Sequence, residues 1–285
     1  MSTDQDVLIY KKQDHIATLT LNRPQSRNAL SVELINRLHA VWRTVDADPE
    51  VRVIILTGSA CGTFCAGMDL KEAARIRQEE GVDVLSKIKD PFHECMRAVE
   101  KPIIAAMNGD LPAGGMMLGL NADLRVALRG TRAAITEVQR GRGSPWAVPL
   151  LWQMPQAIIM EMVLTGDWMP IERLYDMGWI NYLEDTPEAV QAKARQLAER
   201  IRDNAPLSVM AGKAALTKAI SLGCEAGLAE AKRLYQPVYA VKTPLKGRAL
   251  SPRNACPYGR DAESRLKPVL EAHFHLLYHP YCKDL

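Results

Sequence analysis

The chain has 285 residues, of which 47% are hydrophobic and 24% are charged, and its formal net charge is +3. This length and composition suit one large core, or a core with an appended helical unit. The charge is small, and no basic run or aromatic-interleaved basic patch accompanies it. We therefore expect no nucleic acid partner.

The sequence also argues against membrane insertion, secretion and metal binding. No stretch is long and apolar enough to span a membrane, and the first residues lack the apolar core of a secretory signal. The six cysteines are scattered, which favours free thiols in a reducing compartment, and we expect a cytoplasmic protein. The one close pair, Cys61 and Cys65, has no partner at zinc-ligand spacing, so we expect no metal site.

The first half of the chain predicts alternating strands and helices, an α/β pattern. His15 to Leu21 alternates apolar residues with threonine, which predicts a strand, and Ser31 is placed to cap a helix. That helix has apolar residues at helical spacing: Leu34, Ile35, Leu38, Val41 and Trp42. Further elements are a strand over 53–57, a charged and mobile segment over 71–90, a helix over 91–100, and short strands over 124–128 and 133–135. After Pro155 we expect helices over 158–164, 170–177, 187–203 and 206–222.

One stretch, Lys101 to Asp123, joins a buried strand to a helix through a glycine turn. Residues 102–107 are an apolar run of strand length, and Gly114-Gly115 opens an amphipathic segment that runs to about Asn121. Amides at a helix N-terminus have no intrahelical acceptor and can hold an anion or a polarised carbonyl oxygen. A turn packed for stability alone is the alternative interpretation.

A second stretch, FCAGMDLKE over 64–72, repeats this arrangement. It follows the apolar strand over 53–57 and places a glycine where a helical segment begins. Two such turns can supply two N–H donors to a single oxygen, which is the arrangement of an oxyanion hole.

Four motifs together resemble the enoyl-CoA hydratase/isomerase, or crotonase, family. They are LNRPQSRNALS, VIILTGS followed by FCAGMDL, KPIIAAMNG followed by AGG, and EMVLTGDWMPIERLYDMGWIN, and the resemblance covers about residues 7–240. It implies a crotonase-like (ClpP/crotonase) spiral of repeated strand-strand-helix units, with C-terminal helices that build homotrimers, often paired into hexamers. We expect an α/β core over 1–200, a helical region over 201–240 and an atypical tail over 241–285.

The resemblance also assigns the site residues. The backbone amides of Met68 and Gly114 would form the oxyanion hole for a coenzyme A thioester. The coenzyme A channel would be lined by Arg27, Asn28, Ala29, Leu30, Ala66, Asp69 and Leu70. Coenzyme A is then part of the acyl-CoA substrate, and no separate cofactor is expected.

Glu137 matches the second of two glutamates that hydratases of this family use, and a carboxylate there can move a proton beside the thioester. An exposed glutamate paired with Arg140 or Arg142 is the alternative. The first glutamate falls on Met117, which can neither orient water nor donate a proton. The first turn glycine of the family is Ala113 in this chain.

A single carboxylate favours double-bond isomerisation over hydration of the enoyl-CoA, with hydratase and hydratase-lyase activity as alternatives. A catalytically weak protein for acyl-CoA binding or assembly is the alternative from another class. The acyl pocket would be floored by Trp146 beside Met117, with Met116 and Trp152 as further candidates. Ordinary core packing is an equally good explanation for these methionine and tryptophan side chains.

Residues 241–285 look unlike any crotonase C-terminus. Possible codons for Val241 to Glu263, read from their third base, give EDAPQGPRAFAEKRLPVWKGR and a stop, close to the usual family ending AFxEKRxPxWxGR. We therefore hypothesise a frameshifted gene, with a genuine lineage-specific tail as the alternative. The encoding DNA decides between them.

Overall fold

The computed structural model describes residues 6–240, so the frameshift hypothesis for 241–285 lies outside the described residues. Within residues 6–240, every helix is too short or too polar to cross a membrane. Residues up to Tyr239 group into one unit.

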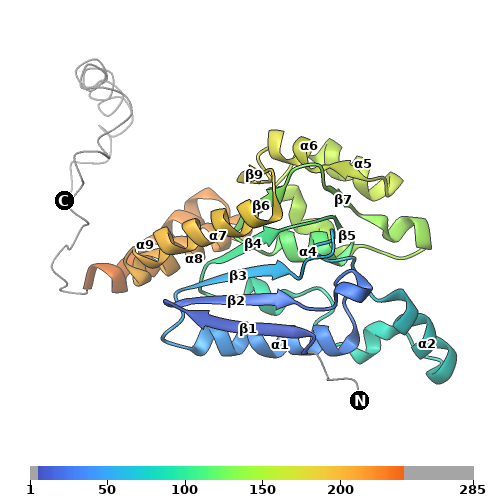
Figure 1. The fold of residues 1–285 in the computed structure, drawn as a ribbon. Coiled ribbons are helices and arrows are strands. Elements are labelled where there is room, and N and C mark those ends of the chain that lie inside the picture. The colour runs from blue at the N-terminus through green and yellow to red at the C-terminus, as the bar shows by residue number, and fades with distance from the viewer. Residues whose placement is uncertain (1–5, 241–285) are drawn as a thin grey trace. The chain divides into compact units, whose positions relative to one another are not determined.

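A six-stranded sheet forms the centre of this unit (Figure 1), in the order β1-β2-β3-β4-β6-β9. Strands β1 (Leu8–Gln13) and β2 (Ile16–Leu21) are an antiparallel hairpin, and Asp14 and His15 form its turn with φ of 52° and 62°. Two positive φ values are typical of the tight turn whose twist matches the flanking strands. The remaining pairs are parallel: β2 with β3 (Val53–Gly58), β3 with β4 (Ile103–Met107), β4 with β6 (Leu124–Leu128), and β6 with β9 (Tyr182–Glu184).

Helices cover both faces of the sheet, which explains why β3 and β4 are continuously apolar. Alternate residues point to opposite faces, so Ile54 and Leu56 join the core under α1 (Val32–Ala47). Val53 and Ile55 join a second core under α7 (Pro187–Arg202). The predicted cap is confirmed, because Ser31 accepts a hydrogen bond from the Leu34 amide at 3.1 Å.

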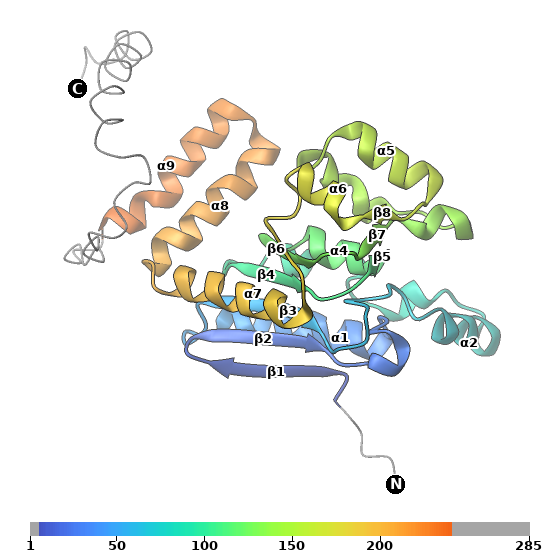
Figure 2. The same cartoon turned by 45° about the horizontal axis from the view of Figure 1, so that its top comes forward.

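A small second sheet lies beside α4 (Gly114–Leu120) and orders β5 (Leu111–Pro112), β7 (Arg132–Ala134) and β8 (Met169–Pro170). The helices of the second half of the chain, besides α7, are α5 (Gln156–Thr165), α6 (Ile171–Asp176), α8 (Pro206–Leu222) and α9 (Cys224–Ala240). Figure 2 shows α8 and α9 side by side, and Lys218 of α8 bonds Glu230 of α9 at 2.9 Å.

Two sequence-based predictions are wrong in this region. The charged segment over 71–90 is largely helical, as α2 (Leu70–Glu80) and the 3-10 helix η2 (Val84–Lys87). Only Ile76 of α2 is buried, so this helix has almost no apolar periodicity to reveal it. The helix expected over 91–100 is a single turn, α3 (Glu94–Arg97), because His93 before it adopts a left-handed conformation with φ of 53°.

Candidate active site

The two glycine turns predicted from the sequence pack directly against each other. A Cβ built on Gly67 would lie 3.1 Å from the amide nitrogen of Gly114, and one built on Gly114 would lie 3.1 Å from the Cα of Gly67. A Cβ on Gly115 would lie only 2.3 Å from the carbonyl oxygen of Cys65. Glycine is required at these positions because the two main chains have no room for a side chain between them.

The backbone amides of Met68 and Gly114 both lack a hydrogen-bond acceptor within residues 6–240. Leu30 pairs with Met68 through a parallel bridge, in which Leu30 donates to Gly67 at 2.8 Å and Asp69 donates to Leu30 at 3.0 Å. The residue bracketed by such bonds directs its own N–H away from the partner strand. Gly114 is the first residue of α4, where an amide has no intrahelical acceptor.

Both residues line one cavity of about 820 Å³, a volume suited to a small-molecule ligand. Seven other residues predicted for the site line the same cavity: Arg27, Leu30, Ala66, Leu70, Met117, Glu137 and Trp146. The wall is completed by apolar side chains such as Val84, Leu85 and Phe92, and by the cations of Arg77, Arg140 and Arg142. An anionic ligand with an apolar part suits this lining.

Glu137 lies in the 3-10 helix η3 (Thr136–Arg140), and a hydrogen bond from a second 3-10 helix, η4 (Pro145–Trp152), fixes its carboxylate. The indole Nε1 of Trp146 donates to Glu137 Oε1 at 2.8 Å. The other oxygen, Oε2, is buried and has no hydrogen-bond partner among residues 6–240. Burial raises the pKa of Glu137, and the Trp146 hydrogen bond opposes that rise. A partly buried carboxylate with one free oxygen is suited to accept and return a proton.

Two other carboxylates line the cavity, and each pairs with an arginine. Asp83 accepts from Arg142 at 2.5 and 3.0 Å, and the pKa of Asp83 falls to about 2, chiefly because of that hydrogen bond. Asp110 lies 3.8 Å from Arg132. Glu137 itself is paired with neither Arg140 nor Arg142 in the described part of the chain. Its free oxygen therefore distinguishes it from Asp83 and Asp110.

Met117 stands where a second catalytic carboxylate was considered from the sequence. It is 4% exposed, lies in the first turns of α4 and lines the cavity.

The neighbouring Ala113 has φ of 49° and ψ of −114°, a backbone conformation that a side chain disfavours and glycine tolerates. The alanine thus places local strain beside the turn.

Three predicted channel residues, Asn28, Ala29 and Asp69, lie outside the cavity lining and hold its wall together. The amide of Asn28, which is fully buried, donates to the carbonyls of Ser59 and Thr63, both at 2.9 Å. Asp69 caps α2 through the amides of Lys71 and Glu72 and accepts from Arg23 at 2.9 Å. Ala29 is buried, and its carbonyl also accepts from Arg23.

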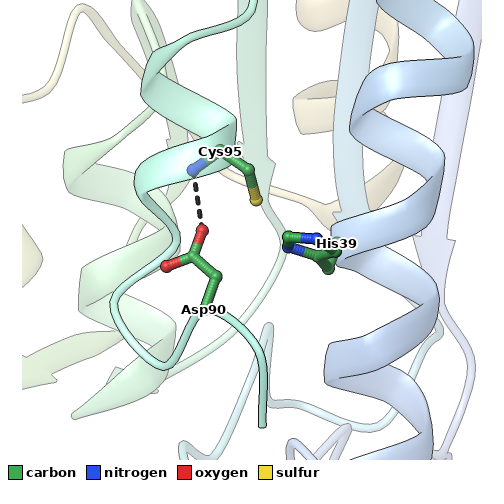
Figure 3. A group of neighbouring side chains, drawn as sticks. All are labelled: His39, Asp90 and Cys95. Carbon is green, nitrogen blue, oxygen red and sulfur yellow. Dashed lines mark hydrogen bonds between the residues drawn. The ribbon is translucent and has the colours of Figure 1, made fainter.

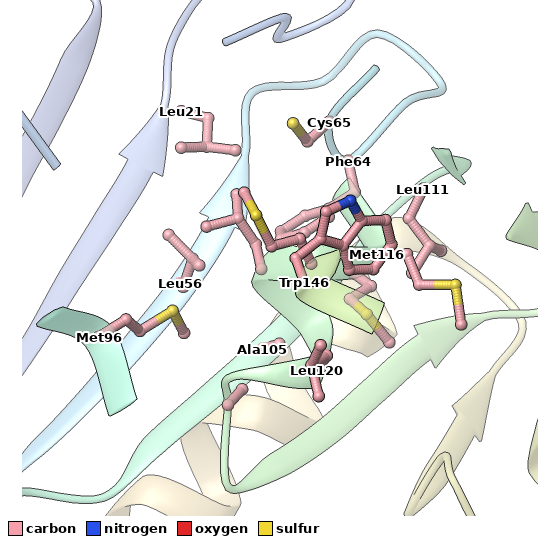
Figure 4. Close-up of a cluster of buried hydrophobic side chains, with 14 of the residues drawn as sticks. Leu21, Leu56, Phe64, Cys65, Met96, Ala105, Leu111, Met116, Leu120 and Trp146 are labelled. Atoms are coloured by element: carbon pink, nitrogen blue, oxygen red, sulfur yellow. The ribbon is translucent and has the colours of Figure 1, made fainter. Parts of the chain in front are cut away.

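The aromatic and methionine side chains divide between the pocket and its surroundings. Met117 and Trp146 line the cavity, and Trp146 also belongs to the buried cluster drawn in Figure 4. Met116 is fully buried in that cluster and Trp152 is 58% exposed, so the prediction that they line the pocket is wrong. Cys65 is buried and burial raises the pKa of its thiol to about 12, so it packs as an unreactive side chain.

Sequence reasoning missed two contacts that shape the site. Trp146 was expected as a pocket floor, and its hydrogen bond to Glu137 was not foreseen. The Arg142–Asp83 pair, which joins the loop after η3 to η2, was not foreseen either. Both depend on how the two 3-10 helices pack, and no periodic pattern in the sequence reports that packing.

Comparison with known proteins identifies the family. The sequence profile of the enoyl-CoA hydratase/isomerase family matches residues 11–249, most of the chain. The chain therefore belongs to this family, and it is an enzyme family that acts on acyl-CoA.

Individual relatives agree with the family assignment. The chain is 34% identical over 226 residues to (E)-benzylidenesuccinyl-CoA hydratase of Thauera aromatica, which covers 75% of this chain and 84% of that protein. It is 35% identical to the enoyl-CoA hydratase EchA19 of Mycobacterium tuberculosis, with 72% and 78% covered. An enoyl-CoA hydratase structure from Mycobacterium tuberculosis superposes with a TM-score of 0.72 at 35% identity, covering 83% and 91%. One from Bacillus anthracis gives 0.79 at 27% identity, covering 86% and 95%. The predicted crotonase-like fold is thereby confirmed.

Proposed function

We propose that this chain isomerises the double bond of an enoyl-CoA with a single carboxylate as the acid and base. Two observations together support it. Glu137 Oε2 is buried and has no hydrogen-bond partner within residues 6–240, and Met117 occupies the position at which a second carboxylate was considered. Shifting a double bond needs a proton taken from one carbon and returned to another, which one carboxylate can do.

The thioester oxygen of a 3-enoyl-CoA accepts hydrogen bonds from the amides of Met68 and Gly114. Glu137 Oε2 takes a proton from C2, and the electron pair of that C–H bond forms a dienolate whose charge rests on the thioester oxygen. The two amides stabilise this charge. Glu137 then returns the proton to C4, which leaves the double bond between C2 and C3 and restores the carboxylate.

Arginines at the cavity wall support binding of the phosphates of coenzyme A. Arg27 and Arg77 both line the cavity. The carbonyl of Arg27 accepts from the Ala66 amide, in the loop that carries Met68, at 3.1 Å, and Arg77 lies in α2. Cations there attract phosphate oxygens. Coenzyme A then enters as part of the substrate, and the reaction needs no other cofactor.

Hydration of a 2-enoyl-CoA is the second candidate, because the relatives named above are hydratases. Glu137 alone would then orient the water and protonate the neighbouring carbon. A hydratase-lyase reaction would begin with the same addition of water. Without a second carboxylate we expect this reaction to be slower than isomerisation. A catalytically weak acyl-CoA-binding protein is the candidate from another class.

Incubation of the purified protein with 3-enoyl-CoA and with 2-enoyl-CoA separates these candidates. Isomerase activity converts the first substrate to the 2-enoyl product, and hydratase activity consumes the second with formation of a 3-hydroxyacyl-CoA. Binding of both without turnover would leave the binding protein. Turnover of the 2-enoyl substrate that is faster than isomerisation would contradict the preferred reaction.

We also propose that the chain assembles as a homotrimer or hexamer. Large apolar side chains on α8 and α9 are exposed in the single chain, among them Leu216 at 76%, Ile220 at 51% and Leu228 at 58%. Burying such a surface between copies is favourable. Light scattering on the purified protein measures the assembly, and a monomer at micromolar concentration would contradict it.

A further inference from the structure

A cluster of metal-binding side chains lies between α1 and α3, apart from the residues assigned to the acyl-CoA reaction. His39 of α1, Asp90 before α3 and Cys95 in α3 each offer one ligand atom, and these atoms all lie within 4.8 Å of one another. Figure 3 shows the sulfur of Cys95 and the ring of His39 directed toward each other, with the Asp90 carboxylate beside them. The three side chains are half-buried.

Two histidines in this part of the fold, His39 and His93, have unpaired ring nitrogen atoms. His93 is 1% exposed, and in the part of the chain that the structure describes neither of its ring nitrogens has a hydrogen-bond partner. Its ring lies close enough to Asp90 and His39 to interact electrostatically with both. The Nδ1 atom of His39 is also buried, and no described residue is its hydrogen-bond partner. Of the eight unpaired buried side-chain atoms within residues 6–240, three are therefore imidazole nitrogens at this cluster.

Three unpaired imidazole nitrogens in one part of the fold indicate that a ligand binds there. An unpaired buried polar atom destabilises a fold by about 1–3 kcal/mol, so native structures pair these atoms with protein, water or an ion. Asp90 already holds the start of α3, because it accepts from the amides of Glu94 at 2.9 Å and Cys95 at 2.7 Å. Those bonds fix the carboxylate in place and leave the histidine nitrogens unexplained.

We propose that His39, Asp90 and Cys95 bind one Zn²⁺ ion. Thiolate, imidazole and carboxylate are the ligands that zinc prefers, and they bind it at about 2.0–2.3 Å in a tetrahedron. Ligand atoms then lie roughly 3.3–3.8 Å apart, so no pair of them needs to approach by more than about 1.5 Å. The fourth position takes a water, and one nitrogen of the buried His93 ring is a candidate partner for that water.

The binding step involves no change of oxidation state. The Cys95 thiol releases its proton to solvent as the sulfur–zinc bond forms, and His39 supplies its neutral lone pair. The ion fastens α3 to α1. Pro91 and Phe92, between Asp90 and α3, line the acyl-CoA cavity, so the ion also fixes that part of the wall. This role is structural and does not depend on which reaction the cavity performs.

The test measures zinc in the tag-free full-length protein after incubation with zinc chloride and dialysis. We expect one zinc per chain and a rise in melting temperature of roughly 5 °C or more relative to the chelator-treated protein. Replacement of zinc by cobalt should give a thiolate-to-cobalt absorption band. Zinc well below one per chain, with no shift in melting temperature, would overturn the proposal.

Matched variants locate the ion. Cys95→Ser should lose the thiolate band, and His39→Gln should weaken zinc binding at least tenfold. Cys256→Ser is the control, because residues 241–285 also contain cysteines and histidines. Loss of the band in Cys256→Ser with its retention in Cys95→Ser would contradict the assignment. If Cys95→Ser fails to fold, His39→Gln and the zinc content of the unchanged protein still decide.

Discussion

The two halves of the site are held in different ways. The amides of Met68 and Gly114 are placed by main-chain packing, because Gly67, Gly114 and Gly115 fit against neighbouring backbone with no space for a Cβ. Glu137 is placed by a side chain, through one hydrogen bond of 2.8 Å from Trp146. The anion-binding half therefore tolerates little change, whereas single substitutions can retune the acid/base half.

The substitution with the largest expected effect, Glu137→Gln, tests the acid/base half of the site alone. Glu137→Gln keeps the size of the side chain and an oxygen for the Trp146 hydrogen bond but removes the base. Turnover of 3-enoyl-CoA should fall about 10²- to 10⁴-fold, while acyl-CoA affinity by calorimetry stays nearly unchanged. Glu161→Gln, at an exposed carboxylate paired with Arg173, is the control and should keep full activity. An unchanged rate in Glu137→Gln would remove this residue from the mechanism.

The next effect tests the main-chain half. Gly115→Ala forces the turn apart, since its Cβ would sit 2.3 Å from the Cys65 carbonyl oxygen. Losing one oxyanion donor costs about 10²- to 10³-fold in rate, so we expect a fall in kcat/KM of that order and a lower melting temperature. In the control Gly119→Ala, on the same helix, the nearest atom is the flexible Met107 sulfur at 3.1 Å. Equal activity in both variants would mean that this packing does not place the amides.

Met117→Glu asks whether a second carboxylate changes the reaction. With two carboxylates, one can hold water while the other delivers a proton, so hydration of 2-enoyl-CoA relative to isomerisation should rise by roughly tenfold. Met117→Gln has a similar size and no charge, and it should leave the ratio near its original value. Product analysis by liquid chromatography gives the ratio, and an increase in Met117→Gln as large as in Met117→Glu would contradict the role of the carboxylate.

Trp146→Phe tests, through the pH dependence of kcat/KM, whether the indole hydrogen bond sets the pKa of Glu137. Burial raises the pKa of Glu137 and the indole hydrogen bond lowers it, so removing the indole N–H raises this pKa further. The base is then protonated up to a higher pH, and the acid limb of kcat/KM should move up by about one pH unit. Activity should recover above the new pKa. Trp152→Phe changes an exposed tryptophan and should leave the profile in place. Coincident profiles for the two variants would show that the hydrogen bond does not tune Glu137.

The smallest effect concerns stability. Ala113 has φ of 49° in a conformation that costs a non-glycine residue about 1–3 kcal/mol, part of which Ala113→Gly should recover. We expect a rise in melting temperature of roughly 2–4 °C with little change in rate. Ala60→Gly, at an exposed position without a positive φ, should bring no such rise. A lower melting temperature for Ala113→Gly would show that the turn is unstrained.

The sequence predicted those features that local chemistry determines. The apolar run of β3, the Ser31 cap of α1 and the glycines of the two turns each depend on neighbouring residues, and each appears where it was expected. The sequence predicted that a helical segment begins at the turn over 64–72, where α2 starts, but it did not predict that the helix continues through the charged residues to Glu80. That extent was missed because the helix depends on the Asp69 cap and has one buried residue to mark it.

Features that depend on contacts between residues distant in sequence could not be predicted. The indole of Trp146 reaches Glu137 only once η3 and η4 have packed, and Asn28 proves to support the wall because Ser59 and Thr63 come beside it. His39 meets Asp90 and Cys95 only through the packing of α1 on α3. The expectation of no metal site was based on the residues near Cys61 and Cys65, and those residues carry no information about the cluster of His39, Asp90 and Cys95.

A crystal structure with a bound acyl-CoA tests the central claim most directly. The account predicts that the thioester oxygen lies about 2.7–3.1 Å from the amide nitrogens of both Met68 and Gly114, with Glu137 Oε2 facing C2 of the acyl group. A thioester oxygen that meets only one of these amides, or an acyl group whose C2 is far from Glu137, would contradict it.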